Sequence, residues 1–351
     1  TGSKQWQEGG KGDLIVTFDG ARLGLWSGLY VTVHQEWLYG NDANKVGAGY
    51  MTAVNTAMAF PRQGGYEADT SIVITQNFNE QWSLSVGKFN MLDAVAKTPL
   101  IGGGGLNTFM NLGLAAPISG VTPPYLVGGS LTLKTAPASF SLLVYDPRNA
   151  QNPEVIEHPF SQGTTASLSM TVPVKIAGLE GYQNVRGVYS SQTGVDFSAL
   201  QQLGLPPAAQ GPLGTKQGYW FLAYSFQQYL VQNAANPKEG WGFFGQFTVS
   251  DGNPNPVKWS MLAGLGGSSP IPGRSLDLWG IGYFRYTLGQ DLVNGLAPLD
   301  IDLTANQGVE AYYNLAITPW FRMTANVQYV KPFSPTNQHA VFAGLRTQIK
   351  F

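Results

Sequence analysis

A small set of charged side chains in this sequence has the chemistry to bind polar molecules. Arginine presents a planar fork of N–H donors that can hold hydroxyl groups or attract anions, and carboxylates accept hydrogen bonds. Within alternating stretches of sequence, these groups occupy the parity opposite to the apolar residues. The set is Arg186, Arg285, Arg322, Arg346, Glu36, Glu310 and His34. Such stretches predict strands with one apolar face and one face that carries these groups.

A glycine-rich segment, TPLIGGGGLNTFMN (98–111), is the second candidate. Its four successive glycines, Gly102 to Gly105, allow positive φ and let the chain fold where side chains would not fit. Asn107 and Asn111 offer donors and acceptors that suit hydroxyl-rich solutes, and the Phe109 ring could stack on the apolar face of a sugar. The alternative is an external loop without a binding role. The Lys-Ser/Thr of a phosphate-binding loop is missing.

Enzyme chemistry is not expected from this sequence. His34, His158 and His339 are scattered along the chain, and there is no cysteine, which leaves no thiolate metal site and no disulfide. No serine has the context of an activated nucleophile, and the acidic residues are too dispersed to suggest a glycosidase pair. We therefore predict no catalytic residue, no metal site and no cofactor.

The elements that must position these groups are strands. Alternation with a period of two is clearest towards the C-terminus and recurs upstream, giving roughly fifteen segments of a length that can cross a bilayer at a tilt. They lie near 12–25, 27–38, 68–78, 82–90, 124–134, 138–146, 167–174, 178–190, 216–230, 241–250, 258–265, 276–287, 309–317, 321–329 and 340–351. Because single-chain barrels have even counts, we expect about sixteen. Alternation is poor in 82–90 and 216–230, where a bulge is one explanation, so the direction of Lys88 and Asn90 stays undetermined.

Composition favours a wall with lipid on one side and water on the other. Charged residues make up 12% of the 351 residues, whereas glycine numbers 44, and the mean hydropathy is −0.06. Apolar residues are therefore interleaved with uncharged polar ones. The net charge of −1 does not suggest a nucleic-acid partner. The sequence has no run of about 18 apolar residues, which argues against a transmembrane helix.

The connections between the predicted strands alternate between long and short. Long ones fall near 40–67, 91–123, 147–163, 191–215 and 287–306, and short ones near 79–81, 135–137, 175–177 and 318–319. This alternation is typical of a closed antiparallel transmembrane β-barrel with long extracellular loops and short periplasmic turns. We predict one barrel domain over 1–351, with a flexible N-terminal segment (1–11) and an inward constriction loop (91–123).

Aromatic residues near the predicted strand ends indicate two girdles at the membrane interfaces. They are Trp26, Trp37, Tyr39, Trp82, Trp220, Trp241, Trp259, Trp320 and Phe351. Phe351 also closes an alternating strand, which is the usual end of an outer-membrane barrel.

At this point the chain resembles the carbohydrate-selective porin family, the OprB-like porins. The similar segments are QGVEAYYNLAITPW (307–320), NVQYVKP (326–332), AVFAGLRTQIKF (340–351) and WSLSVGKFN (82–90), the last followed by the glycine-rich segment 98–111. The resemblance implies a sixteen-stranded outer-membrane pore that is narrowed by an inward loop and prefers neutral sugars. This chain is compact for the family, and its loops are short in comparison with the family pattern.

The main functional hypothesis is a water-filled pore for passive diffusion of small polar solutes, with sugars as the expected class. The alternative is a channel for anions or small carboxylic or aromatic acids, selected by the lumen arginines. A plugged structural barrel and a soluble all-β binding protein predict no conductance and extraction without detergent, respectively. The expected partners are the solutes and outer-membrane lipid, with homo-oligomerisation left open. The N-terminus, TGSKQWQEGGKG, is polar and has no apolar secretory core. From the barrel features of the rest of the chain, we expect export to a Gram-negative outer membrane with removal of a signal peptide.

Overall fold

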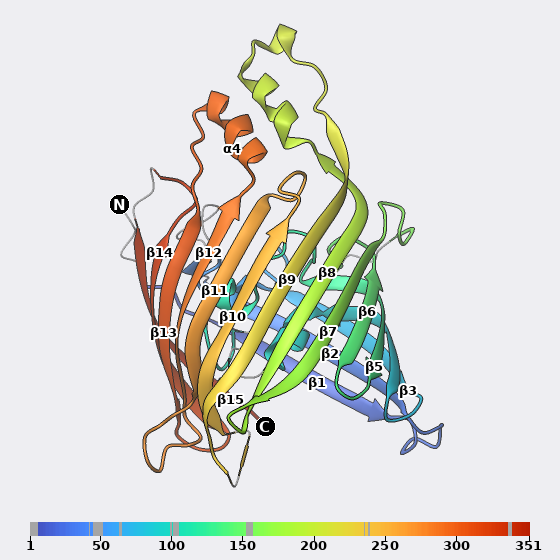
Figure 1. The fold of residues 1–351 in the computed structure, drawn as a ribbon, viewed down its shortest axis with the longest axis vertical. Coiled ribbons are helices and arrows are strands. Elements are labelled where there is room, and N and C mark those ends of the chain that lie inside the picture. Colours follow the sequence, from blue (N-terminus) through green and yellow to red (C-terminus); the bar gives the residue numbers. More distant parts are fainter. Residues whose placement is uncertain are drawn as a thin grey trace.

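The chain forms one large antiparallel sheet that curls around an interior occupied by loop segments (Figure 1). The computed structural model describes residues 6–41, 43–44, 52–62, 65–98, 100, 105–151, 157–234, 236–237, 239–335 and 339–351. Gly102 to Gly104 of the glycine run lie outside this set. Of the N-terminal segment 1–11, which we expected to be flexible, residues from Gly9 onward already belong to the first strand.

Fifteen strands make up the sheet over the described residues. They are β1 (Gly9–Asp19), β2 (Leu29–Gly40), β3 (Ala68–Asn77), β4 (Trp82–Asn90), β5 (Tyr125–Lys134), β6 (Ser139–Tyr145), β7 (Thr165–Ile176), β8 (Leu179–Val195), β9 (Thr215–Gln232), β10 (Gly240–Ser250), β11 (Val257–Ser268), β12 (Leu278–Leu288), β13 (Asn306–Ala316), β14 (Phe321–Lys331) and β15 (Ala340–Ile349).

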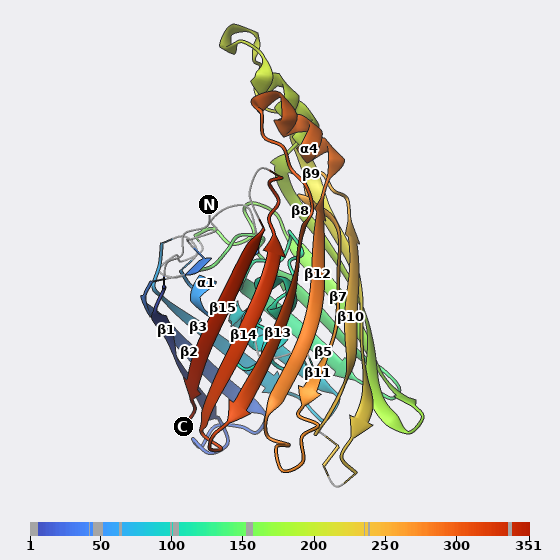
Figure 2. The same cartoon turned by 90° about the vertical axis from the view of Figure 1, so that its left-hand side faces the viewer.

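Each strand pairs with its neighbours in the sequence, so the order runs from β1 to β15 without a crossover. The all-β antiparallel class is confirmed, and the predicted count of about sixteen compares with fifteen here. No pairing between β1 and β15 is found among the described residues. Figure 2 shows both strands on the same side of the curled sheet.

The two faces of the sheet differ in the way that the alternation predicts. On β13 and β14, the even-numbered residues from Asn306 to Ala316 and from Thr324 to Val330 are buried on the inner face. The odd-numbered residues point outward: Val327 on β14 is 50% exposed, and on the next strand, β15, Leu345 is 63% exposed. An apolar outer face exposed over the whole sheet is typical of strands that contact lipid.

Two irregularities explain why the alternation is poor in 82–90 and 216–230. Gly87 in β4 has a φ of +141°, a conformation that side chains rarely adopt, and there the pattern changes parity. Val86 lies on the outer face, whereas Lys88, only two residues later, bonds inward to Asp69 at 2.7 Å. In β9 the register with β10 shifts opposite Trp241 and Gly242.

The connections hold only short helices. These are α1 (Thr56–Ala59), α2 (Met91–Ala96), α3 (Leu112–Ala115), α4 (Gln290–Leu296) and the 3-10 turns η2 (Phe197–Gly204), η3 (Pro207–Ala209) and η4 (Ala297–Leu299). Among the described residues, no helix has the length and hydropathy needed to cross a membrane. The connections that follow β2, β4, β6, β8 and β12 are long and share one rim, which carries α4 (Figures 1 and 2).

Candidate functional site

The candidate site is the inner face of the sheet together with the connection between β4 and β5. We call residues 91–123 the interior segment, of which 91–98, 100 and 105–123 are described. Two asparagines start its helices: the Asn90 side chain accepts from the Leu92 N–H, and the Asn111 side chain accepts from the Gly113 N–H. These caps satisfy backbone donors that a short helix otherwise leaves unpaired.

Glu310 on β13 fixes the middle of the interior segment to the wall. Its carboxylate accepts hydrogen bonds from the backbone N–H groups of Met110, at 2.5 Å, and Asn111, at 2.9 Å. The Asn326 amide on the neighbouring strand β14 donates to the same carboxylate. Glu310 is fully buried, and a buried carboxylate is stabilised only by donors of this kind. The residue therefore holds the interior segment and does not project into free solvent.

Arg346 and Gln328 extend this contact on both sides of Glu310. Arg346 on β15 donates to the backbone oxygens of Gly105 and, at 3.0 Å, Thr108. The Gln328 side chain accepts from the Asn111 amide at 3.0 Å. The inner faces of β13, β14 and β15 thus bind the backbone of residues 105–111 through a continuous hydrogen-bonded seam.

An apolar cluster packs the same part of the interior segment against the wall, and Phe109 belongs to it. Phe109 is fully buried, and its ring meets those of Tyr312 at 4.9 Å and Phe244 at 5.7 Å between centroids. Leu114 and Phe284 complete the centre of the cluster. The expectation that Phe109 stacks on a solute is wrong for this conformation, because the ring is covered by the wall. Its role is to anchor the interior segment.

The two asparagines of the glycine-rich segment have different surroundings. Asn111 is fully buried, and its side-chain oxygen accepts from the Thr52 hydroxyl at 2.9 Å. It is therefore a structural residue in this conformation and is not presented to solutes. Asn107 is half-buried, and its side-chain oxygen has no hydrogen-bond partner among the described residues. Asn107 keeps the predicted role open.

Residues 52–62 also lie inside, which the sequence did not predict. The Thr56 backbone and hydroxyl both donate to the Met110 carbonyl oxygen at 2.8 Å. The Gln328 amide donates to the Val54 carbonyl oxygen at 2.7 Å, and Asn306 accepts from the Thr52 N–H at 3.0 Å. The connection after β2, which we expected to be external throughout, therefore packs on the interior segment.

Arg186 lies on the inner face of β8, as its parity predicted. Its guanidinium donates to the hydroxyls of Thr122, at 2.8 Å, and Ser167, at 3.1 Å. Thr122 also shares a hydrogen bond with the Tyr145 hydroxyl at 3.1 Å. Arg186 thus contacts the end of the interior segment through neutral partners.

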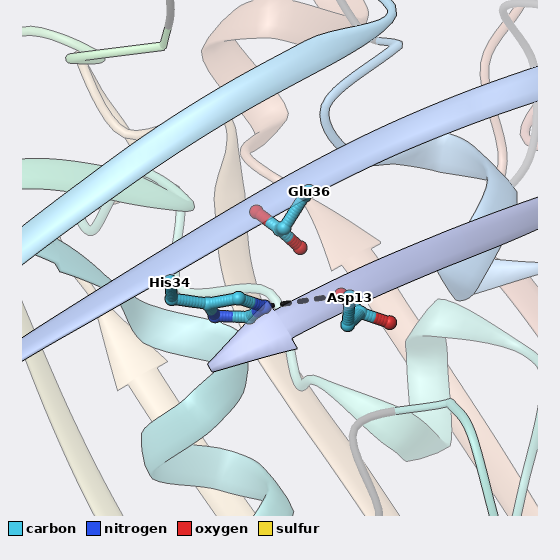
Figure 3. A group of neighbouring side chains, drawn as sticks. All are labelled: Asp13, His34 and Glu36. Carbon is cyan, nitrogen blue, oxygen red and sulfur yellow. Dashed lines mark hydrogen bonds and ion pairs between the residues drawn. The ribbon is translucent and has the colours of Figure 1, made fainter. Parts of the chain in front are cut away.

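A cluster of full charges occupies the inner face of β1 and β2. Asp13, His34 and Glu36 lie together there (Figure 3), and their possible ligand atoms are within 4.8 Å of one another. The Lys11 ammonium pairs with both carboxylates, at 3.3 Å from Asp13. His34 lies 3.1 Å from Asp13 through Nε2 and 2.9 Å from Asp93 through Nδ1. Because the carboxylates already bond to Lys11 and His34, we interpret the cluster as an ion-pair network and not as a metal site.

This network connects the wall to the start of the interior segment. Asp93 belongs to α2, so the His34 bond ties that helix to β2. Glu36 also accepts from the Tyr125 hydroxyl on β5 at 2.9 Å. Lys88 on β4 pairs with Asp69 on β3 at 2.7 Å. The predicted site residues His34 and Glu36 therefore belong to one network across the inner faces of β1 to β5.

The two remaining arginines differ in direction. Arg322 lies on the inner face of β14 at the rim of short turns, where it donates to Asn314 at 2.8 Å and to the Leu276 carbonyl oxygen at 2.9 Å. Arg285 points outward, and its assignment to the lumen is wrong. On β12 the buried inner residues are the even-numbered Gly282, Phe284 and Tyr286. Aromatic residues on both faces of this strand hid the parity.

Sequence reasoning missed Lys11, Asp13, Asp69, Asn326 and Gln328. Asn326 and Gln328 could have been found from the sequence, because they alternate with Ala325, Val327 and Tyr329 and therefore lie on the polar face of their strand. Lys11 and Asp13 lie in a glycine-rich stretch where no apolar residues alternate with them, so their direction could not be predicted. Lys88 carried the signal of a bulge, but only the backbone at Gly87 gave its direction.

Comparison with known proteins gives matches over almost all of the chain. The family model described as carbohydrate-selective porin, OprB family, matches residues 7–351. Porin B of Pseudomonas aeruginosa (strain PAO1) is 26% identical over 186 residues, which cover 48% of this chain and 37% of Porin B. The match thus spans little more than a third of that relative's length.

Two solved structures of Pseudomonas putida OprB share the fold. The high-pH structure has a TM-score of 0.82 at 18% identity and covers 98% of this chain and 88% of its own. The low-pH structure has a TM-score of 0.53 at 15% identity, with 98% and 86% covered.

Proposed function

The chain belongs to the OprB family of carbohydrate-selective porins, and on this premise we propose that it is an outer-membrane pore for passive diffusion of small polar solutes, chiefly sugars. The proposal includes closure of the curled sheet into a barrel, a water-filled lumen and narrowing of that lumen by the interior segment. Porin B and Pseudomonas putida OprB are the relatives that support it.

The observation that carries the proposal is the docking of the interior segment on the inner face. Backbone groups of residues 105–111 bond to Glu310 and Arg346 on strands far away in the sequence. A segment that is folded into the lumen and held there by buried hydrogen bonds would narrow the aqueous path without closing it. Pore radius and lining groups are the properties that decide which solutes pass.

The outer face supports a place in the membrane. Its strands expose Leu, Ile, Val and Phe side chains, such as Val309 at 39% and Val341 at 69%. Trp37, Tyr39 and Trp220 lie near one rim, and Trp82, Trp320 and Phe351 near the other. Rings with an apolar body and a polar edge favour the headgroup zones, so these two groups mark the interfaces.

The charges on the inner face favour neutral solutes over anions. Arg186, Arg322 and Arg346 bond mainly to neutral hydroxyl, amide and carbonyl groups. Carboxylates including Asp13, Glu36 and Asp69 lie on the same face, so the lumen has no excess of one sign. A selective anion pore needs a field of one sign along the path, whereas hydroxyl-rich solutes need mixed donors and acceptors.

Swelling of protein-containing liposomes tests the proposal with neutral sugars and with carboxylates of matching size. We expect sugars to enter at rates set by their size and carboxylates to gain no advantage. Arg186→Gln changes an inner guanidinium and should alter the permeation order, whereas Arg285→Gln, on the outer face, is the matched control. Strong anion preference in a planar bilayer, without block by sugars, would favour the acid-selective alternative. Absence of any conductance would exclude a pore.

A further inference from the structure

The outer face carries an isolated pair of basic residues on β12 and β14. The acidic strand residues Asp13, Asp19, Glu36, Asp69, Glu180 and Glu310 all have the parity of the inner face. On the outer face of β12 to β15, the charged strand residues are Arg285 and Lys331. A charge that faces lipid is costly unless it lies at the interface and meets a polar partner there.

The register brings the two residues to one level of the wall. Gln307 on β13 pairs directly with Arg285 on one side and with Lys331 on the other. Arg285 donates to the Gln307 side-chain oxygen at 3.0 Å, and the Tyr283 hydroxyl donates to the same oxygen at 3.0 Å. All three strands reach the rim of long connections at this level. The pair therefore lies where the outer headgroup zone begins.

Arg285 is held in position and still has donors to spare. Its guanidinium lies 5.5 Å from the centre of the Trp259 ring on β11, a cation–π contact that fixes the plane of the fork. Among the described residues, its Nε is buried from solvent and has no hydrogen-bond partner. Within the same part of the chain, no ion pair reaches Arg285 or Lys331. The cations are therefore not neutralised by the protein that the structure describes.

A third basic group extends the row towards β15. His339, which precedes β15, meets the outward-facing Tyr329 with its ring at 5.2 Å between centroids. The Tyr329 hydroxyl bonds to Nδ1 of His339, which leaves Nε2 for another partner. Rings and basic side chains thus lie along one rim from β11 to β15.

We propose that Arg285 and Lys331, with Trp259 and Tyr283 as the supporting rings, form a binding site for the phosphate group of a membrane lipid at the rim of long connections. A guanidinium fork matches a phosphate in two parallel hydrogen bonds, and an ammonium adds a point charge beside it. The acyl chains of such a lipid would run down the exposed apolar face below the pair. The inference rests on the proposed membrane placement of the sheet.

Native mass spectrometry of the purified full chain in detergent tests the site. The probes are phosphatidic acid, a phosphorylated lipid A, diacylglycerol with the same acyl chains, and inorganic phosphate. The test variant is Arg285→Gln with Lys331→Gln. The control for net charge is Lys134→Gln with Lys175→Gln, which removes two cations of inner-face parity near the opposite rim.

We expect the wild type and the control to retain the two phosphorylated lipids and the test variant to lose them by roughly tenfold or more, since each of the two basic residues near a membrane surface contributes a factor of about five. Equal retention by the test variant would overturn the site. Equal retention of diacylglycerol, or displacement by inorganic phosphate at the same concentration, would overturn the assignment to a phosphorylated lipid. A change in the number of chains per particle without a change in lipid retention would assign the pair to an interface between copies instead.

Solute entry into liposomes is measured on the same variants. Unchanged permeation with lost lipid retention separates this inference from the proposed function, because a failure of the pore would abolish permeation in every variant alike.

Discussion

On β13–β15 the inner wall holds the interior segment through amides, backbone groups, buried rings, one carboxylate and one guanidinium, whereas on β1–β4 it carries oppositely charged side chains in ion pairs. Glu310 and Phe109 represent the first region, and both are fully buried. His34 and Asp93 represent the second, and the Asp93 side chain is 40% exposed. The same segment is thus fixed at its middle by dry contacts and near its start by wetter ionic contacts.

The two regions should differ in how strongly salt affects their hold on the interior segment. Hydrogen bonds to a buried carboxylate and ring packing do not respond to salt, because water and ions do not reach them. The pair of His34 with Asp93 is partly exposed through Asp93, and salt weakens a pair that water and ions can reach. We therefore infer that the β13–β15 contact sets where the interior segment lies and that the β1–β4 contact adjusts α2.

Removal of the buried ring should have the largest effect. Phe109→Ala leaves a cavity between Tyr312 and Phe244 and should lower the free energy of unfolding by about 3–5 kcal/mol. The interior segment should also become looser, so single-channel conductance should rise and become noisy. Thermal unfolding and planar-bilayer recordings measure the two effects. Phe140→Ala, at a partly exposed outer position, is the control for loss of a ring. An unchanged conductance would show that Phe109 does not anchor the segment.

Glu310→Gln should come next in size. The amide nitrogen would face the N–H groups of Met110 and Asn111 or the Asn326 amide, leaving at least one buried donor unpaired at a cost of about 1–3 kcal/mol. Conductance should increase at both low and high salt, which a bilayer recording at two ionic strengths can measure. If the change in conductance depends strongly on salt, the contact at β13–β15 does not differ from the ionic contact at β1–β4 in the way we infer.

Asp93→Asn should have a smaller effect, and unlike that of Glu310→Gln it should depend on salt. The variant removes the ionic contact between the partly exposed Asp93 carboxylate on α2 and His34, which we expect to contribute about 1 kcal/mol or less. The difference from wild type should be visible at low salt and should shrink at high salt. Sugar entry into liposomes at two ionic strengths is the measurement. A salt-independent loss as large as that of Glu310→Gln would contradict the distinction.

The smallest effect is expected from an ion pair outside the wall, Asp146 with Arg148, which serves as a reference. Burial raises the pKa of the Asp146 carboxyl, but hydrogen bonds from Arg148 and from the Phe160 N–H outweigh it and hold the pKa below its usual value. Stabilisation is therefore present at neutral pH and lost as the pH falls through the lowered pKa. Hydrogen exchange at the Phe160 amide, corrected for intrinsic rates, should lose protection only in acid. In Asp146→Asn, protection should be low throughout. If wild-type protection does not change in acid, this linkage is wrong.

The alternation along β13, β14 and β15 was sufficient to predict the sheet, its antiparallel order and the inward direction of Glu310, Arg322 and Arg346. This works because successive residues of a strand point to opposite faces. In a sheet between lipid and polar surroundings, apolar and polar residues must therefore alternate along each strand. Parity failed where this rule was interrupted. It left Lys88 undetermined beside Gly87, and it misdirected Arg285, because β12 has large rings on both faces.

What the interior segment contacts could not be read from residues 91–123 alone. The bonds to Glu310 and Arg346 join parts of the chain about two hundred residues apart, and nothing local encodes which wall a loop reaches. The same applies to Phe109, which was expected to meet solutes and instead packs between Tyr312 and Phe244, and to residues 52–62. In the regularly alternating strands the sequence determined which side a residue faces, because that depends on neighbours in the chain. Only the tertiary structure decided which of those faces meet.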